Sequence, residues 1–209
     1  MGVGIDGEFF SAVALDFDGV VLDSAGIKLD AFETVLPDDP RVRAYLGENE
    51  GRPRHEKFKY VWEWILNAEY TPEIAQGLDR RFSDLVDTKM ASARLIQGVD
   101  RFIRDVSGQC YLAIVSAAPE TDVRRLLDLH GMIRYFDEVH GGVADKADVL
   151  QQIIGRAGIT ASEIIFFGDT EADRLAAIRA GVAFVGVQSD FTRDGFVGAF
   201  RTIADFTDL

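Results

Sequence analysis

Short apolar runs alternate with helix-like segments through the second half of the chain, and no other feature of the sequence narrows the fold as much. The strand-like runs cover residues 111–115, 136–139, 163–167 and 182–187. The helix-like segments cover residues 99–106, 119–129, 146–157 and 171–180, and Gly158 and Gly181 stand where glycines commonly end helices. Continuous apolar strands that alternate with helices predict a parallel sheet with helices on both faces.

One more apolar run lies near the N-terminus, separated from this pattern by a long polar segment. Residues 12–17 end at Asp18-Gly19, which predicts a buried strand that meets a loop. Between residues 25 and 94 the apolar positions recur at helical spacing, and Thr71-Pro72 is typical of a helix start. We therefore predict a Rossmann-like α/β core of residues 1–22 and 95–209 and an inserted all-helical cap of residues 23–94. Residues 201–206 are expected to add an edge strand, and the insertion is expected to cover the carboxyl edge of the sheet, where ligands bind.

Composition and charge exclude several classes of partner. Hydrophobic residues make up 47% of the chain, enough for a sizeable core, and the net charge of −13 opposes binding to nucleic acid or an anionic membrane. The single Cys110 excludes an internal disulfide and fits a reducing compartment. No basic residue precedes Lys28, so we expect no signal peptide, and no apolar run approaches the ~18 residues of a membrane span. We expect a cytoplasmic protein; the sequence carries no signal for an oligomeric state.

Polar side chains follow the predicted strands at the points where the strands end. They are Asp16 and Asp18 after the first strand, Ser116 after the second, Lys146 after the third, and Asp169 and Asp173 after the fourth. Each has an ordinary explanation on its own: an Asx turn, a helix cap or a solvated helix start. The carboxyl ends of parallel strands share one edge of a sheet, however, so we expect these groups to converge there.

Four short motifs carry a resemblance to a known family. The segment Asp16-x-Asp18-Gly19-Val20-Val21-x-Asp23-Ser24 resembles the first motif of the haloacid dehalogenase-like phosphohydrolases. Ser116, Lys146 and Gly168-Asp169-x-x-x-Asp173 resemble the second, third and fourth motifs in the family's order. The place of the helical insertion resembles the subgroup of phosphoglycolate phosphatase-like and β-phosphoglucomutase-like enzymes.

The resemblance implies a magnesium-dependent phosphatase that acts on a small phosphorylated metabolite. Asp16 would be the nucleophile that forms an aspartyl-phosphate, and Asp18 the general acid and base. Mg²⁺ would be held by the side chains of Asp16 and Asp169 and by the backbone carbonyl of Asp18.

Further positions complete the implied site. Ser116 and Lys146 would hold the phosphoryl oxygens, and Asp173 would orient Lys146 or the waters of the metal. Gly19 and Ala117 are expected to bind substrate beside them.

A basic segment stands out in the acidic insertion. Gly51-x-x-Arg54 resembles the substrate-loop pattern of this subgroup, so Arg54, with Arg52 or Lys57, is a candidate ligand for an anionic leaving group. The alternative is a solvated helix start.

Rival functions are separated by particular residues. A β-phosphoglucomutase-like transferase is disfavoured because Lys28 stands where those enzymes have a histidine, and a dehalogenase is disfavoured because Asp18 supplies a second acid. A receiver-like signalling domain is disfavoured because it would carry its phosphoacceptor on a later strand, whereas the expected nucleophile here, Asp16, lies at the first strand. A non-catalytic scaffold that binds a phosphorylated ligand is disfavoured because every key position of the four motifs holds a residue that could carry out the chemistry. Sugar phosphates, phosphoglycolate and nucleotides all remain candidate substrates.

Overall fold

The computed structural model describes residues 2–49, 52–188, 196 and 198–209. The chain divides into two compact units, and each is described by itself. One unit, the core unit, joins Met1–Asp23 to Arg94–Leu209, and the other, the helical unit, consists of Ser24–Ala93.

A six-stranded parallel sheet organises the core unit. Its strands lie in the order β5 (Glu138–His140), β4 (Tyr111–Val115), β3 (Ala12–Leu15), β6 (Ile164–Gly168), β7 (Ala183–Val187) and β8 (Arg201–Ile203). The strand nearest the N-terminus is therefore central, and Leu15 pairs with Ile114 on one side and Phe167 on the other. Strand β5 begins two residues later than the sequence predicts, and the predicted edge strand is limited to three residues.

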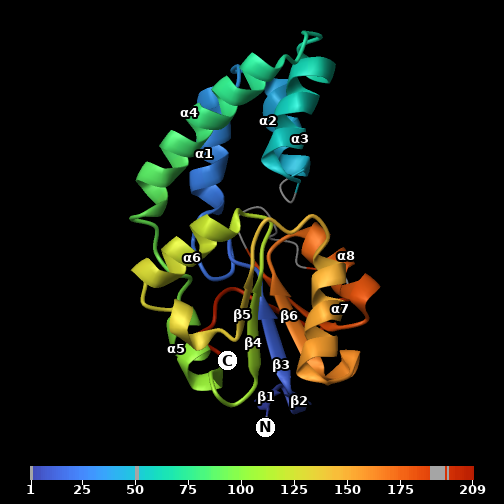
Figure 1. Cartoon of the computed structure of the whole chain (residues 1–209). Coiled ribbons are helices and arrows are strands. Elements are labelled where there is room, and N and C mark those ends of the chain that lie inside the picture. The colour runs from blue at the N-terminus through green and yellow to red at the C-terminus, as the bar shows by residue number, and fades with distance from the viewer. Residues whose placement is uncertain (1, 50–51, 189–195, 197) are drawn as a thin grey trace. The chain divides into compact units, whose positions relative to one another are not determined.

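Helices α5 (Val99–Val106) and α6 (Glu120–Leu129) lie on one side of this sheet, and α7 (Lys146–Ala157) and α8 (Glu171–Ala180) on the other (Figure 1). Two short 3₁₀ turns, Ile133–Tyr135 and Ala161–Glu163, complete the connections. Gly158 and Gly181 adopt the left-handed conformation that ends α7 and α8, as predicted. The Rossmann-like α/β class with an inserted all-helical domain is thus confirmed.

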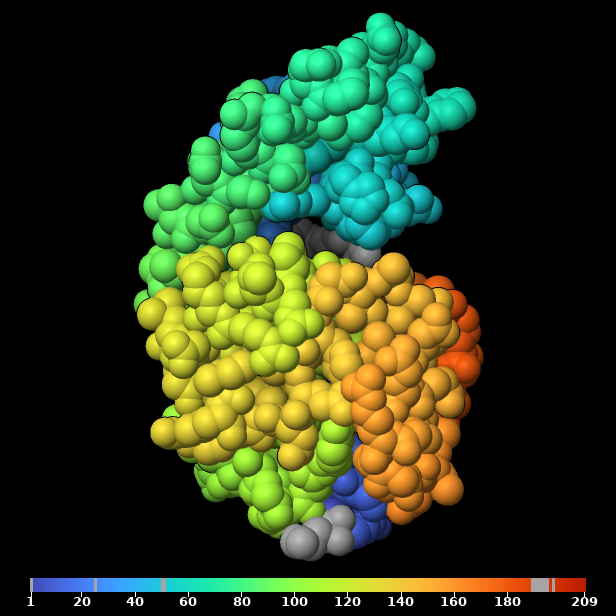
Figure 2. All heavy atoms as spheres, in the orientation of Figure 1, coloured from blue at the N-terminus to red at the C-terminus, as the bar shows by residue number. Residues whose placement is uncertain are grey.

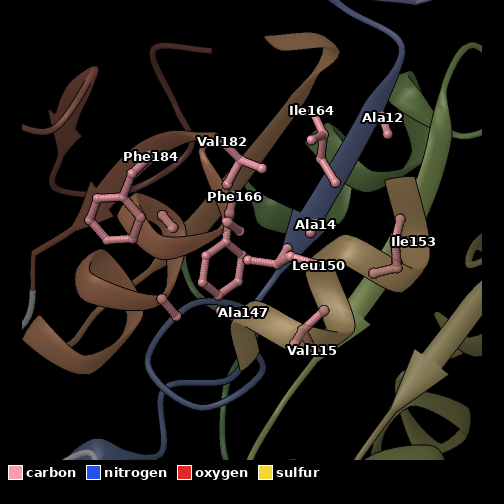
Figure 3. Packing of buried hydrophobic residues seen from close by; sticks show 14 residues of the cluster. Ala12, Ala14, Val115, Ala147, Leu150, Ile153, Ile164, Phe166, Val182 and Phe184 are labelled. Carbon is pink, nitrogen blue, oxygen red and sulfur yellow. The ribbon is translucent and has the colours of Figure 1, made fainter. Parts of the chain in front are cut away.

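Small and branched side chains alternate on the sheet face that meets α7 and α8. Ala12 and Ala14 of β3 lie between the larger Val115, Ile164 and Phe166 of the neighbouring strands (Figure 3). Leu150 and Ile153 of α7 pack into this surface and are fully buried. All four residues of β3 are buried, so the strand is covered on both faces and its end is held firmly at the sheet edge.

An N-terminal β-hairpin was not predicted from the sequence. Strands β1 (Val3–Ile5) and β2 (Glu8–Phe10) pair antiparallel across Asp6 and Gly7, both of which have the positive φ of a type I′ turn. Asp-Gly is a known hairpin signal, but strands of three residues leave almost no alternating pattern to detect.

The described elements of the helical unit are α1 (Ala25–Val35), α2 (Pro40–Glu48), α3 (Arg54–Tyr60), a π-helical turn (Val61–Ile65) and α4 (Pro72–Met90). The rings of Phe32, Phe58 and Phe82 meet at its centre with centroid separations of 4.5 to 5.8 Å. Thr71 caps α4 by accepting a hydrogen bond from the Ile74 amide, as its position before Pro72 predicts. Among the helices of the described residues, none is both long and apolar enough to cross a membrane.

Candidate active site

The site is assembled at the carboxyl edge of the central strands. Asp16 follows β3, Ser116 follows β4 and Asp169 follows β6, and these three strands are neighbours in the sheet. The Asp16 amide continues the sheet by donating to the Phe167 carbonyl at 2.8 Å. The sheet register therefore fixes the backbone of Asp16 beside the strand that leads to Asp169.

Lys146 links two buried carboxylates. Its Nζ atom lies 2.8 Å from Asp16 Oδ2 and 2.6 Å from Asp173 Oδ1. Lys146 is the first residue of α7, and Asp145 caps that helix by accepting from the Ala147 amide. Its side chain is only 14% exposed, so Lys146 is not a solvated helix-start lysine.

Asp173 is held by a residue that the sequence analysis missed. The Thr170 hydroxyl donates to Asp173 Oδ2 at 2.6 Å, and the Asp173 amide donates back to that hydroxyl at 3.2 Å. This capping box starts α8 and leaves Oδ1 of the fully buried Asp173 facing Lys146. The spacing Thr170-x-x-Asp173 could have predicted this capping box from the sequence. Acids are so common in the first turn of helices, however, that the spacing alone is not specific.

Gly19 packs directly against Asp169. Gly19 has φ +75°, and a Cβ atom there would lie 2.0 Å from Asp169 Oδ2. The loop is closed by the Gly19 amide, which donates to the Leu22 carbonyl at 2.8 Å, and it leaves Asp18 half-buried. The predicted substrate-binding role of Gly19 stays a prediction. Its observed contact is steric, and a side chain at this position would displace the Asp169 carboxylate.

Three carboxylates are close enough to share a cation. One oxygen each from Asp16, Asp169 and Asp173 lies within 4.8 Å of the others, and all three residues are buried. The predicted magnesium ligands Asp16 and Asp169 are thus together, while both oxygens of Asp173 already accept hydrogen bonds from Lys146 and Thr170.

The charges explain why a cation fits. Burial raises the pKa of Asp16 to about 7, although Lys146 acts in the opposite direction. Burial and the neighbouring Asp16 raise the pKa of Asp169 well above its ordinary value. Burial by itself would lower the pKa of Lys146, but the Asp16 and Asp173 carboxylates raise it. One lysine does not balance three buried acids, and the hard oxygen donors present are those that Mg²⁺ prefers.

Ser116 is buried in the loop between β4 and α6. Its hydroxyl accepts a hydrogen bond from the Ala118 amide at 3.1 Å, whereas the N-cap of α6 is Pro119. Ser116 is therefore not the helix cap. Ala117, between Ser116 and Ala118, is exposed. Its predicted contact with substrate stays a prediction.

Arg54 and Lys57 of the basic segment make contacts within the helical unit. Arg54 Nε lies 2.8 Å from Asp79 Oδ1, its NH1 donates to the Ser83 hydroxyl at 3.1 Å, and its guanidinium covers the Phe82 ring. The ammonium of Lys57 lies 4.8 Å from the Phe32 ring centre, and the residue is buried. Neither is a freely solvated charge. Gly51, the other residue of the predicted substrate loop, lies outside the described residues.

A lysine-bridged acidic site at the carboxyl edge of a Rossmann-like sheet defines an α/β enzyme of the phosphoryl-transfer type. The chain belongs to the haloacid dehalogenase-like hydrolase family, whose model matches residues 13–187. A phosphoglycolate phosphatase from Pseudomonas fluorescens is 36% identical over 203 residues, which cover 87% of this chain and 70% of that protein. Another from Vibrio parahaemolyticus is 33% identical over 197 residues, covering 84% of this chain and 82% of that protein.

Solved structures share the fold at low sequence identity. A predicted phosphoglycolate phosphatase from Haemophilus somnus has a TM-score of 0.78 at 20% identity, covering 95% of this chain and 96% of that chain. CbbY from Rhodobacter sphaeroides, in complex with phosphate, has a TM-score of 0.78 at 18% identity and 96% coverage of both chains. These solved structures show the fold. The family match and the two phosphoglycolate phosphatases described above identify the chain as a phosphatase.

The raised carboxylate pKa values predict an unusual pH dependence of stability without metal. The folded state keeps protons on Asp16 and Asp169 at pH values where the unfolded chain has lost them. The contribution of these two carboxyls to the stability of the metal-free protein should therefore be full near pH 4 and be lost as the pH rises through about 7, the pKa of Asp16. Thermal melts in chelator between pH 5 and 8 measure this slope.

Asp169→Asn is the matched variant. We expect it to melt higher than the native protein in chelator at pH 8, because one buried charge is gone, and to gain less from added Mg²⁺. An identical pH slope in both proteins, or equal stabilisation by Mg²⁺, would contradict the proposed electrostatics.

Proposed function

We propose that this phosphatase hydrolyses a small phosphate monoester with Mg²⁺ through an aspartyl-phosphate on Asp16. The observation that carries the proposal is the position of Lys146, whose ammonium lies within 2.8 Å of both Asp16 and Asp173. This arrangement holds one oxygen of Asp16 and places a cation next to the atom that would approach a phosphoryl group. A purely structural ion pair would need only one acid beside Lys146, whereas two are present. The arrangement therefore supports a nucleophilic role for Asp16 better than a structural one.

The chemistry has two displacements. In the first, an Asp16 carboxylate oxygen bonds to phosphorus, the bond from phosphorus to the leaving oxygen breaks, and Asp18 gives its proton to that oxygen. In the second, Asp18 takes a proton from water, the water oxygen bonds to phosphorus, and the bond to Asp16 breaks to release inorganic phosphate. Lys146 and Ser116 hold the phosphoryl oxygens in both steps.

Mg²⁺ would be held by Asp16, Asp169 and the Asp18 carbonyl, with Asp173 orienting Lys146. When bound, it supplies the positive charge that offsets repulsion between a carboxylate nucleophile and an anionic ester. The raised pKa values of Asp16 and Asp169 support this assignment. Both carboxylates are buried, and the charge of Lys146 does not offset the effect of burial on either.

The substrate class is narrowed by the relatives. The curated proteins most often matched are named phosphoglycolate phosphatase, so a short phosphate ester that bears a carboxylate is the first candidate. Lys28, in place of a proton-relaying histidine, supports water rather than a sugar hydroxyl as the final acceptor.

The first test is a metal and substrate screen with purified protein. Free phosphate should appear in step with loss of a small carboxylate-bearing ester in Mg²⁺, stop in EDTA and return when Mg²⁺ is restored. Ca²⁺ should inhibit, since its larger and looser coordination misplaces the nucleophile.

A hexose 1-phosphate serves as the comparison substrate. Rapid conversion to the 6-phosphate with little free phosphate would replace the phosphatase proposal with the mutase alternative. Full activity in chelator would remove the metal from the mechanism.

The predicted role of Arg54 as a ligand of the leaving group is tested by Arg54→Ala. We expect kcat/KM for the carboxylate-bearing ester to fall roughly ten- to a hundredfold, the value of a charge-assisted hydrogen bond, with p-nitrophenyl phosphate nearly unaffected. Asp79→Asn is the control, because it removes the observed ion pair and keeps the guanidinium. Equal losses with both esters, matched by Asp79→Asn, would assign Arg54 to the stability of the helical unit instead.

A further inference from the structure

The loop that contains Ser116 is held from outside by the chain that leaves β5. The Ser116 amide donates to the His140 carbonyl at 2.9 Å, and the Val143 amide donates to the Ser116 carbonyl at 3.1 Å. The Gly142 amide donates to the Ala118 carbonyl at 2.6 Å. Residues 140–143 therefore clamp both ends of the Ser116–Ala118 turn through backbone groups, and we call this segment the clamp.

Gly141 sits at the tightest point of the clamp. A Cβ atom on Gly141 would lie 2.3 Å from Glu120 Cα, 2.5 Å from Glu120 N and 2.8 Å from the Ala118 carbonyl oxygen. All three are backbone atoms, which cannot rotate away as a side chain can. Only glycine allows the clamp to approach the start of α6 this closely.

Polar contacts hold the two backbones together at this point. Arg124 donates to the Glu120 carboxylate at 2.7 Å and to the Val139 carbonyl at 3.2 Å, so it links α6 to β5. Arg124, and to a lesser degree the Gly141 backbone amide, hold the pKa of Glu120 below its ordinary value. Arg124 thus ties the start of α6 to β5 beside the close contact between Gly141 and Glu120.

The strand that carries the clamp is itself anchored. Glu138 of β5 accepts hydrogen bonds from Tyr111 and His140 and pairs with Arg156 of α7 at 2.7 Å. Since β5 is an edge strand, these contacts supply the support that a second neighbouring strand would otherwise give. The clamp therefore has a fixed position against which the Ser116 turn is set.

We propose that Gly141 is a positioning residue that sets the Ser116–Ala118 turn for binding of a phosphoryl group. The inference rests on the proposed function, because it takes that turn to be the anion-binding one. A methyl group at position 141 must push the Ala118 carbonyl and the start of α6 outward. A misplacement of about 1 Å in a binding group costs up to a hundredfold in rate or affinity.

The test is Gly141→Ala, read out as the affinity for inorganic phosphate in Mg²⁺ by titration calorimetry. We expect phosphate binding to weaken about ten- to a hundredfold and KM for the ester to rise. Mg²⁺ affinity should stay unchanged, because Asp16 and Asp169 follow β3 and β6 and the clamp follows β5. Gly155→Ala is the matched control, since a Cβ on that helical glycine of α7 meets no atom within 4 Å.

A second control separates positioning from stability. Ile153→Val opens a small cavity in the packed face of α7 (Figure 3) and should lower the melting temperature without weakening phosphate binding. Phosphate affinity in Gly141→Ala equal to that of Gly155→Ala would overturn the proposal. So would an equal loss of affinity in Ile153→Val.

If Gly141→Ala does not fold, Arg124→Gln takes its place, because it loosens the same contact without adding atoms. It should weaken phosphate binding more than Arg104→Gln, which breaks a comparably exposed ion pair, with Asp100 on α5. Equal effects would overturn the proposal. Ester hydrolysis by the native protein tests the proposed function separately. If the native protein hydrolyses its ester and the Gly141→Ala variant keeps its phosphate affinity, the role proposed for Gly141 is wrong and the proposed function stands.

Discussion

The pair of short contacts from Lys146 to Asp16 and Asp173 is the interaction on which the rest of the site depends. An ammonium and two carboxylates are brought out of water at one sheet edge, where an unpaired charge would be strongly destabilising. Each partner comes from a different element: Asp16 from the end of β3, Lys146 from the first turn of α7, and Asp173 from the first turn of α8. The alanine-rich face of β3 and the packing of Leu150 and Phe166 keep those elements in place, so the core and the charge cluster depend on one another (Figure 3). The outer surface of α7, orange in Figure 2, hides this packing from view. Burial and the neighbouring Asp16 and Asp173 raise the pKa of Asp169 more than Lys146 lowers it, and this is the physical reason to expect a cation there.

Close approach at two glycines is the second constraint. Gly19 lets its loop lie directly on Asp169, and Gly141 lets the clamp lie on the start of α6. In both places the missing Cβ determines how near a loop comes to groups that we assign to catalysis. Geometry at the edge of the sheet is thus set by sterics as much as by hydrogen bonds.

The sequence predicted the parts of the structure that depend on local patterns. Apolar runs and helical spacing identified the strands and helices of the core. The polar residues that follow those runs predicted the meeting of Asp16, Lys146, Asp169 and Asp173, because parallel strands end at a common edge. The capping box of Thr170, the ion pair of Arg54 with Asp79 and the clamp around Ser116 were not predicted. Contacts between Arg54 and Asp79, or between Gly141 and Glu120, join residues that are distant in sequence, and no local pattern marks them. The hairpin was missed for a different reason: its strands are too short to show an alternation.

The central claim is that Asp16 becomes phosphorylated, and chemical trapping of the intermediate tests it most directly. An acyl phosphate is reduced by borohydride to an alcohol, which converts the phosphorylated aspartate into homoserine. Enzyme quenched during turnover of its ester with Mg²⁺, then treated with borohydride and digested, should give the peptide from the end of β3 with homoserine at position 16. The same treatment of Asp16→Asn should give none. Native protein that turns over its ester yet yields no homoserine at position 16, or yields it at Asp169 instead, would contradict the account.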